Sequence, residues 1–274
     1  MNHLLCFGFG FCAQALAQKL DQKLWRISGT SRSAEGVASI KAQGFEGVLF
    51  DGLNSIANSV THIVSSVPPD AAGDPVLRKF KTELAARANS FDWVAYLSTT
   101  GVYGDRAGCI VDETAALTPN TERGQRRVDA EASWAFLSPH IFRLAGIYGE
   151  GRNALESLKA GTAKRVIKPG QIFSRIHVED IAGIVLASIN NPNPGRIYNV
   201  ADDEPCPPQD VITYAAELLK MVPPLDISFD QAKLSPMAKS FYADSKRVSN
   251  LRVKEELGYK FRYPNYKLGL KALL

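Results

Sequence analysis

Short apolar runs alternate with longer stretches of helical periodicity through the first half of the chain. The apolar runs are typical of buried strands at residues 4–7, 24–28, 47–50, 62–65, 93–97 and 141–144. The periodic stretches predict helices at residues 11–20, 34–42, 74–89 and 121–137, and later at 178–189 and 208–219. Strands that alternate with helices need crossover connections, which favour parallel pairing. The pattern therefore predicts an α/β fold: a doubly wound parallel sheet of the Rossmann type, with ligands at the carboxyl ends of its strands.

The texture of the sequence changes after Gly149, where glycine and proline become frequent. We interpret residues 1–150 as a dinucleotide-binding Rossmann core. Residues 151–274 then supply the remainder of the sheet and a small C-terminal lobe on the substrate side, interleaved with the core as one structural unit.

Composition and charge exclude several classes of function. The chain of 274 residues has a net charge of +4 without a run of basic residues, so a nucleic-acid partner is not expected. No apolar run is long enough for a secretory signal or a membrane span. The four cysteines form no C-x-x-C pair and no cluster with histidines, which predicts no metal site and reduced thiols in a cytoplasmic protein.

A glycine-rich turn follows the first predicted strand and opens the first predicted helix. Its residues fit G-x-G-x-x-G/A, with Gly8 and Gly10 as the glycines and Ala13 as the small closing residue. Gly8 permits a tight turn, Gly10 allows the backbone to approach a pyrophosphate, and Ala13 permits close helix packing. The helix start, with Phe11 and Cys12, would direct amide groups at the anion. The alternative is a glycine turn that only connects core elements.

The end of the second strand distinguishes between cofactors. An NAD-binding protein usually places an acid there to hold the ribose 2′-hydroxyl, but this chain has Thr30, Ser31 and Arg32. Arg32 could pair with a 2′-phosphate and the two hydroxyls could donate to it, so NADP is expected rather than NAD. Asp51, after the third strand, is a candidate acceptor for the adenine amino group. The alternatives are an exposed loop arginine at position 32 and a turn-capping role for Asp51.

Further motifs occur in a fixed order along the chain. They are LSTTGVYG at residues 97–104, RLAGIYGEGR at 143–152, IHVEDIA at 176–182 and YNVADD at 198–203. With the glycine turn, they resemble the NAD-dependent epimerase/dehydratase family, the extended branch of the short-chain dehydrogenase/reductase superfamily. The resemblance covers about residues 2–270, although the chain is shorter than most members that act on nucleotide sugars. We also assign Ser66, Val67 and Pro68, which follow the fourth strand, to the cofactor-binding residues.

The resemblance implies hydride chemistry assisted by a Tyr-x-x-x-Lys pair on the helix after the fifth strand. It assigns Thr99 to the residue that polarises the substrate oxygen. Pro119 and Ala130–Glu131 set the register of that helix, which puts Arg123 at the tyrosine position and Arg127 at the lysine position. An arginine does not release its proton in proteins, so Arg123 cannot act as a general acid or base.

The two arginines are four residues apart and share one helix face. We expect them to lie at the nicotinamide end of the site and to bind an anionic group. The alternative is that both are surface charges.

Two literal Y-x-x-x-K matches occur near the C-terminus, Tyr242…Lys246 and Tyr263…Lys267. We interpret both as coincidental, because they lie far along the chain from the helix that should carry the pair.

Other residues are candidates for proton transfer or for substrate contacts. Tyr103, Tyr148 or a water held at Thr99 could replace the missing tyrosine as proton donor. Tyr148, Arg152 and Arg175 are candidate substrate contacts. Many sugar-modifying members carry an arginine four residues before the histidine of the I-H-V motif, where this chain has a phenylalanine, and we interpret that histidine as structural.

Two functions remain open at this stage. The first is an NADP-dependent oxidoreductase or epimerase/dehydratase-like enzyme that acts on a small, anionic substrate through an atypical site. The second is a catalytically silent NADP(H)-binding regulatory or sensor protein, because the fold alone does not establish chemistry. A homodimer is expected from the resemblance, and neither a membrane nor a nucleic acid is expected as a partner.

Overall fold

The computed structural model describes the whole chain apart from the side chain of residue 237. The strands are β1 Asn2–Phe7, β2 Trp25–Ser31, β3 Glu46–Leu49, β4 His62–Ser65, β5 Trp93–Thr99, β6 Ile110–Val111, β7 His140–Leu144, β8 Gly146–Tyr148, β9 Arg165–Ile167, β10 Arg175–His177, β11 Ile197–Val200, β12 Asp226–Ser228 and β13 Arg247–Val248. The α-helices are α1 Phe11–Lys19, α2 Ala34–Ala42, α3 Pro75–Ala86, α4 Glu122–Trp134, α5 Ala154–Lys159, α6 Val178–Asn190, α7 Pro208–Leu218, α8 Pro236–Phe241, α9 Leu251–Glu256 and α10 Tyr266–Lys271. No helix in the described part of the chain has both the length and the apolar character that a membrane crossing requires.

The chain forms two compact units that are interleaved along the sequence. The sheet unit comprises Met1–Thr99, Gln125–Arg143 and Ile181–Tyr198, and the lobe unit comprises Thr100–Gly124, Leu144–Asp180 and Asn199–Leu274. These limits differ from the division near residue 150 that the change in glycine and proline content predicts. The reason is that most of α6 and the start of β11 pack with the first half of the chain, whereas residues 100–124 and 144–150 pack in the lobe unit, which the local composition of those segments does not reveal.

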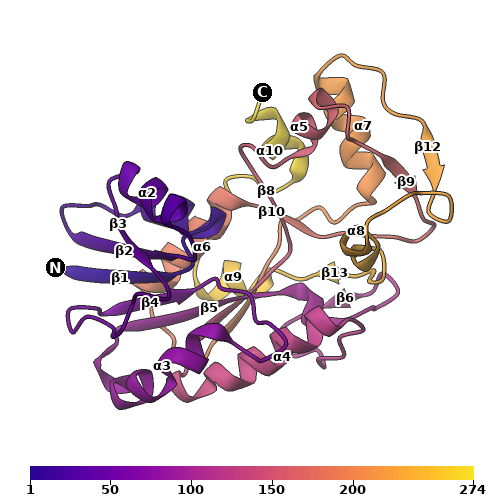
Figure 1. The fold of residues 1–274 in the computed structure, drawn as a ribbon. Helices are drawn as coiled ribbons and strands as arrows, with labels where there is room; N and C mark the ends of the chain where they lie inside the picture. The colour runs from indigo at the N-terminus through magenta and orange to yellow at the C-terminus, as the bar shows by residue number, and fades with distance from the viewer. The chain divides into compact units, whose positions relative to one another are not determined.

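The predicted doubly wound sheet is confirmed. Seven strands follow the order β11-β7-β5-β4-β1-β2-β3, and the neighbouring pairs β1–β2, β2–β3, β1–β4 and β4–β5 are parallel. Helices α3 and α4 lie on one face of this sheet, and α2 and α6 lie on the other (Figure 1). The order changes direction at β1, so the loops after β1 and β4 leave the sheet side by side, which is where α/β proteins bind ligands.

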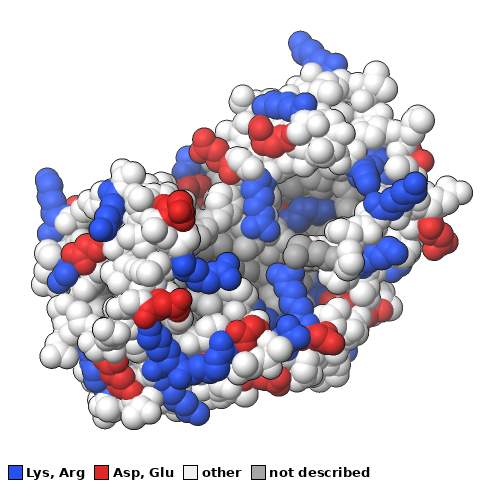
Figure 2. All heavy atoms as spheres, viewed as in Figure 1, with Lys and Arg blue, Asp and Glu red and all other residues white. Residues whose placement is uncertain are grey.

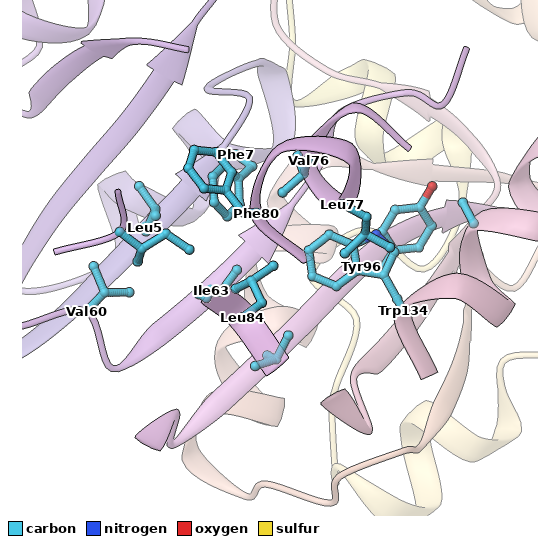
Figure 3. Packing of buried hydrophobic residues seen from close by; sticks show 13 residues of the cluster. Leu5, Phe7, Val60, Ile63, Val76, Leu77, Phe80, Leu84, Tyr96 and Trp134 are labelled. Atoms are coloured by element: carbon cyan, nitrogen blue, oxygen red, sulfur yellow. The ribbon is translucent and has the colours of Figure 1, made fainter. Parts of the chain in front are cut away.

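The side chains of β5 alternate between the two faces of the sheet and pack against the helices on both. Val94 and Tyr96 face α3 and α4 in a buried cluster, and the Tyr96 and Trp134 rings are stacked with their centroids 5.9 Å apart. Figure 3 shows these rings beside Leu77 of α3, while Phe80 lies next to Phe7. Trp93 points to the other face, where its indole nitrogen donates to the Ser188 hydroxyl of α6 at 3.1 Å. A strand buried on both faces explains why this run is apolar throughout.

One buried carboxylate joins α3 to α4. Asp74 caps α3 by accepting from the backbone nitrogens of Val76 and Leu77, at 2.9 and 3.1 Å. Its second oxygen accepts from the Trp134 indole nitrogen at 3.0 Å. The helix predicted from residue 74 thus begins one residue later, because residue 74 is the cap rather than the first turn. Its predicted end at residue 89 is replaced by a short 3-10 turn at Ala88–Ser90.

A second buried carboxylate fixes α4 against β5 and β7. Glu131 accepts from the Ser98 hydroxyl at 2.5 Å and forms an ion pair with Arg143, whose Nη2 lies 2.7 Å from Oε2. The side chains of Arg143 and Glu131 are only 3% and 5% exposed. Helix α4 and strands β5 and β7 are therefore joined by one buried, hydrogen-bonded ion pair.

The lobe unit contains short elements that sequence periodicity missed. Its strands form three small parallel pairs, β10–β8, β12–β9 and β13–β6. Helices α5, α7 and α10 contribute to one apolar cluster that includes Tyr148, Leu155, Ala215 and Tyr266. Elements of two to six residues are too short to show a helical or strand period, so periodicity does not identify them.

Removal of the Glu131 charge should destabilise the protein markedly. In Glu131→Gln, Arg143 remains buried without a counter-charge, so we expect the free energy of unfolding to fall by about 3 kcal/mol. The matched control is Glu156→Gln, which breaks a half-exposed ion pair with Lys159 and should cost about 0.5 kcal/mol or less. Urea unfolding followed by circular dichroism measures both, and losses of equal size would contradict this role for Glu131.

Candidate functional site

The glycine turn after β1 is shaped by the ends of two neighbouring strands. Gly8 has a φ angle of +80°, and a Cβ on it would lie 2.9 Å from the Ser66 hydroxyl. The Gly8 nitrogen donates to the Thr30 hydroxyl at 2.9 Å, and the Ser66 hydroxyl donates to the Gly8 oxygen at 2.8 Å. Only glycine satisfies both the angle and the close approach, as the motif predicts.

The second glycine of the turn faces open space. Gly10 is the N-cap residue of α1, and a Cβ built on it would meet no protein atom within 4 Å. No side chain caps α1, and no acidic residue lies in its first turn. By contrast, Ser33 caps α2 and Asp74 caps α3. The start of α1 therefore lacks a side-chain cap and borders open space at Gly10, as a phosphate-binding helix start does.

The other residues of the turn support its position. Phe11 is half-buried, and Cys12 and Ala13 are buried, so they pack the first turn of α1 against the sheet. Sequence reasoning missed Gly29, whose added Cβ would lie 2.3 Å from the Phe9 ring. A glycine inside a strand is a signal for such a close approach.

The three residues at the end of β2 differ in exposure and in their hydrogen bonds. The side chain of Thr30 is 2% exposed, and its hydroxyl accepts from Gly8, so it holds the turn instead of pointing to solvent. Ser31 is half-buried, and its hydroxyl accepts from the Ser33 nitrogen at 3.3 Å. Arg32 is exposed, and its guanidinium has no hydrogen-bond or ion-pair partner in the described part of the chain.

Glu35, in the first turn of α2, is the acid nearest to Arg32 in the sequence. Hydrogen bonds from its own backbone nitrogen and from Ser33 lower the pKa of Glu35. Its carboxylate is thus held at the start of the helix.

Residues after β3 and β4 form the next part of the candidate dinucleotide site. Asp51 is exposed, and the Lys79 ammonium holds its backbone by donating to the oxygens of Phe50 and Asp51, at 2.7 and 2.8 Å. Val67 is half-buried and Pro68 is exposed after the end of β4. Lys79 lies on α3 and carried no signal in the sequence, because only the packing of α3 brings it to this loop.

Thr99 is half-buried at the end of β5, and Arg127 on α4 is bonded to the same strand. The Arg127 guanidinium donates to the Tyr96 hydroxyl at 2.7 Å and to the Leu97 oxygen at 3.0 Å. Burial raises the pKa of Tyr96 to about 12, so its phenol stays neutral. Arg127 is therefore fixed to the carboxyl end of β5, and part of its guanidinium remains for other acceptors.

Arg123 lies one turn before Arg127 on α4 and belongs to the lobe unit. Its side chain is exposed, and its guanidinium carbon lies 5.8 Å from the centroid of the Phe241 ring. The expectation that both arginines bind one anionic group remains a prediction. What the contacts establish is that the two arginines have different surroundings, an aromatic ring for Arg123 and a strand end for Arg127.

Tyr103 occupies a structural position in the lobe unit. It is fully buried, and its hydroxyl donates to the Asn199 side-chain oxygen at 2.7 Å. A buried phenol already engaged in a hydrogen bond is poorly suited to donate a proton to a ligand. Tyr103, a candidate proton donor in the sequence analysis, thus links the loop after β5 to the end of β11 within the lobe unit.

Tyr148, Arg152 and Arg175 also lie in the lobe unit. Tyr148 is 8% exposed, its hydroxyl lies 3.5 Å from the Asn265 oxygen, and burial raises its pKa strongly. Arg152 is exposed. Arg175 is half-buried and donates to the oxygens of Phe173 and Cys206, at 3.1 and 3.3 Å.

The I-H-V-E-D motif anchors the C-terminal segment of the same unit. Asp180 is fully buried and accepts from the Tyr259 hydroxyl and from the backbone nitrogens of Arg262 and Tyr263, at 2.9, 2.7 and 3.0 Å. The His177 ring packs against Tyr263 with centroids 4.2 Å apart. These contacts agree with the structural interpretation of this histidine.

Asp202, which follows β11, carries a buried carboxyl group. One oxygen accepts from the Glu204 nitrogen at 3.2 Å, and the other has no hydrogen-bond partner among the described residues. Burial raises the pKa of Asp202 to about 8, and the Arg175 charge opposes that rise only in part. The group therefore holds a proton at neutral pH, which a short sequence motif could not indicate.

The buried Asp202 should make stability depend on pH. Its folded-state pKa of about 8 lies above the ordinary value of 3.8, so the folded protein binds the proton more tightly than the unfolded chain. Stability should then fall as the pH rises from about 4 to 8. Asp202→Asn removes this effect, so the variant should gain melting temperature relative to wild type between pH 5 and pH 8. The control is Asp226→Asn, at a carboxylate that is 58% exposed. A difference for Asp202→Asn that is constant with pH would contradict the assignment.

Comparisons with known proteins place the chain among relatives of similar length. No protein-family model matches it. Protein YeeZ of Escherichia coli K12 is 26% identical over 287 aligned positions, which cover 97% of each chain. A functionally unknown protein of Silicibacter pomeroyi is 52% identical, with a TM-score of 0.96 over 100% of this chain and 98% of that one.

A Methylobacillus flagellatus protein assigned by name to the NAD-dependent epimerases/dehydratases is 25% identical to this chain. Its TM-score is 0.77, over 99% of this chain and 97% of that one. This similarity extends beyond the sheet to the lobe elements, and it agrees with the strand order and the glycine turn described above. The chain is therefore similar over nearly its whole length to a protein named as an NAD-dependent epimerase/dehydratase, and its sheet has the strand order of a Rossmann-type fold.

Proposed function

We propose that this chain is an NADP-dependent oxidoreductase or epimerase/dehydratase-like enzyme that acts on a small, anionic substrate. The observation that carries the proposal is the turn at Gly10, where an uncapped helix start borders open space. A dinucleotide pyrophosphate fits that position, because it needs close backbone approach and unpaired amide donors. The relative named as an NAD-dependent epimerase/dehydratase supports the same class of chemistry.

The residues proposed to hold or shape the dinucleotide site come from the ends of four adjacent strands, β4, β1, β2 and β3. Gly10 and the first turn of α1 would bind the pyrophosphate, and Asp51 would accept from the adenine amino group. Thr30 and Ser66 would act indirectly, since their hydroxyls shape the turn around Gly8. The sequence assigned Thr30 to the 2′-phosphate, and its burial instead favours this positioning role.

The preference for a 2′-phosphate rests on Arg32. Its guanidinium is exposed, has no partner in the described part of the chain, and follows a strand that ends without an acid. The nearby carboxylate of Glu35 is engaged at the start of α2 and does not neutralise Arg32. A free guanidinium at this place favours phosphate over a ribose hydroxyl.

The anionic substrate is proposed from the arginines at the family's catalytic positions. Figure 2 shows that basic and acidic side chains are interspersed over the face in view, so overall charge does not specify the substrate. Arg123 and Arg127 present guanidinium groups where the family presents a phenol and an amine. Such groups match carboxylate or phosphate oxygens with paired hydrogen bonds.

The chemistry proposed follows from what these residues can and cannot do. A bound nicotinamide dinucleotide supplies or accepts a hydride. Thr99 would donate a hydrogen bond to the substrate oxygen, and Arg127 would bind ribose hydroxyls beside β5. Arg123 remains protonated and so contributes charge but no proton transfer.

A silent NADP(H)-binding regulatory protein is the second candidate. The observation that favours it is the commitment of Tyr103 to Asn199 together with an arginine at position 123. Both functions predict dinucleotide binding, and only the enzyme predicts that a carbonyl compound is reduced when NADPH is present.

Arg32→Ala tests the cofactor preference. We expect NADPH affinity to fall about tenfold or more, because a charge-assisted hydrogen bond contributes about 1.5–3 kcal/mol. NADH affinity should remain nearly unchanged, since NADH lacks the 2′-phosphate. Calorimetric titration of both nucleotides measures the effect, and wild-type protein that binds NADH as tightly as NADPH would refute the preference.

Gly10→Val tests the position of the phosphate loop. The new side chain meets no protein atom within 4 Å at its Cβ, so the variant should keep the melting temperature of the wild type. It should nevertheless lose NADPH binding, because valine occupies the space proposed for the pyrophosphate. A folded Gly10→Val protein that binds NADPH normally would show that the loop has been assigned wrongly.

A further inference from the structure

Two consecutive cations on α3 hold two loops at the carboxyl ends of the strands. In the loop after β4, Arg78 forms two hydrogen bonds with the Asp70 carboxylate, at 2.7 and 2.8 Å. In the loop after β3, the Lys79 ammonium donates to the backbone oxygens of Phe50 and Asp51, at 2.7 and 2.8 Å. All five residues belong to the sheet unit. One helix therefore fixes both loops through separate charged groups.

The Phe50 ring anchors the loop after β3 in the core. It packs edge-on against the rings of Phe7 and Phe80, with centroids 6.5 and 6.1 Å away, and Figure 3 shows these two partners side by side. The Phe50 backbone nitrogen donates to the last carbonyl oxygen of β2 at 2.8 Å. The Lys79 ammonium lies 5.3 Å from the Phe50 ring centroid and extends this anchorage to the backbone of Asp51.

The position of the Asp51 carboxylate matters because purine bases differ at one edge. Adenine carries an amino group at C6 and no hydrogen on the adjacent ring nitrogen N1. Hypoxanthine carries an oxygen at C6 and a hydrogen on N1. A carboxylate fixed opposite C6 accepts from adenine but meets an oxygen in hypoxanthine, which leaves both groups without a donor. A carboxylate that can shift toward N1 would accept from hypoxanthine instead.

We infer that Lys79 is a positioning residue that makes the dinucleotide site specific for adenine. The inference rests on the proposed function, in which Asp51 accepts from the adenine amino group. Lys79 acts on the base only through Asp51. Its ammonium holds the backbone of the turn, so the carboxylate stays opposite the amino group and does not shift toward N1. The ligand class is thus an adenine dinucleotide and not a purine dinucleotide in general.

Two substitutions at position 79 separate the ammonium from the rest of the side chain. Lys79→Met keeps an apolar stem beside Phe50 and removes the donors. Lys79→Arg keeps the donors. Arg87, at the other end of α3, shows that an arginine on this helix can hold loop carbonyls, because its guanidinium donates to the oxygens of Ile56 and Ala57, at 2.9 and 3.2 Å.

The test compares NADPH with its deamino form, in which hypoxanthine replaces adenine, by calorimetric titration. Wild type should bind NADPH about tenfold more tightly, because the deamino form leaves the carboxylate unpaired. Lys79→Met should bring the two affinities within about threefold of each other, and Lys79→Arg should restore the wild-type ratio. NADH and deamino-NADH serve as a second pair, because both cofactors carry adenine.

Two further variants show that the effect passes through Asp51. Arg78→Met removes the same charge from the adjacent residue but releases the loop after β4, so the affinity ratio should stay within about twofold of wild type. Asp51→Ala should bind both forms of the nucleotide equally. Adding Lys79→Met to Asp51→Ala should not change the ratio further. A merely structural role for Lys79 would lower the melting temperature or both affinities and leave their ratio intact.

The outcomes separate the inference from the proposed function. Wild type that binds neither NADPH nor NADH refutes both. Wild type that binds each nucleotide and its deamino form equally refutes the contact between Asp51 and adenine, and the inference with it, while dinucleotide binding stands. If wild type discriminates and Lys79→Met discriminates equally well, the inference alone is wrong.

Discussion

The buried ion pair between Glu131 and Arg143 is the constraint on which the placement of α4 depends. Charges removed from water are costly unless they are paired and hydrogen-bonded. Glu131 meets that condition only when α4 has one rotation and one height against the sheet. Its partners are Ser98 on β5 and Arg143 on β7. A shift of α4 by one residue would bury an unpaired carboxylate and an unpaired guanidinium. The pair therefore acts as a register for the helix as well as a contact within the core.

That register determines what the helix presents to ligands. Arg127 lies one turn before Glu131 on the same face, so it also reaches the sheet and bonds to Tyr96 and Leu97. Arg123 lies one turn further, in the lobe unit, and its guanidinium carbon lies 5.8 Å from the centroid of the Phe241 ring. Helix α4 thus carries two guanidinium groups one turn apart. Such groups bind oxygen atoms well and exchange no protons at neutral pH.

The glycine turn shows a similar division between residues that shape a site and residues that face a ligand. Thr30 and Ser66 turn their hydroxyls inward to Gly8, because an unusual backbone conformation has to be supported by its neighbours. Gly10 and Arg32 are left open to solvent at the same strand ends. Residues two apart in the sequence thus have opposite roles, because Thr30 lies within β2 with its side chain buried, whereas Arg32 follows Ser31, where the chain leaves the sheet.

The sequence by itself determined the order of strands and helices in the first half, the glycine turn and the absence of an acid after β2. These features are local: alternation, helical periodicity and a glycine spacing are properties of neighbouring residues. The inward hydroxyl of Thr30, the burial of Tyr103 against Asn199 and the approach of Phe241 to Arg123 were decided only by the tertiary structure. Each depends on segments that are distant in the chain and meet through packing, and no short pattern records such a meeting. The buried carboxyl of Asp202 belongs with them, because its raised pKa arises from the surrounding apolar packing and not from its neighbours in sequence.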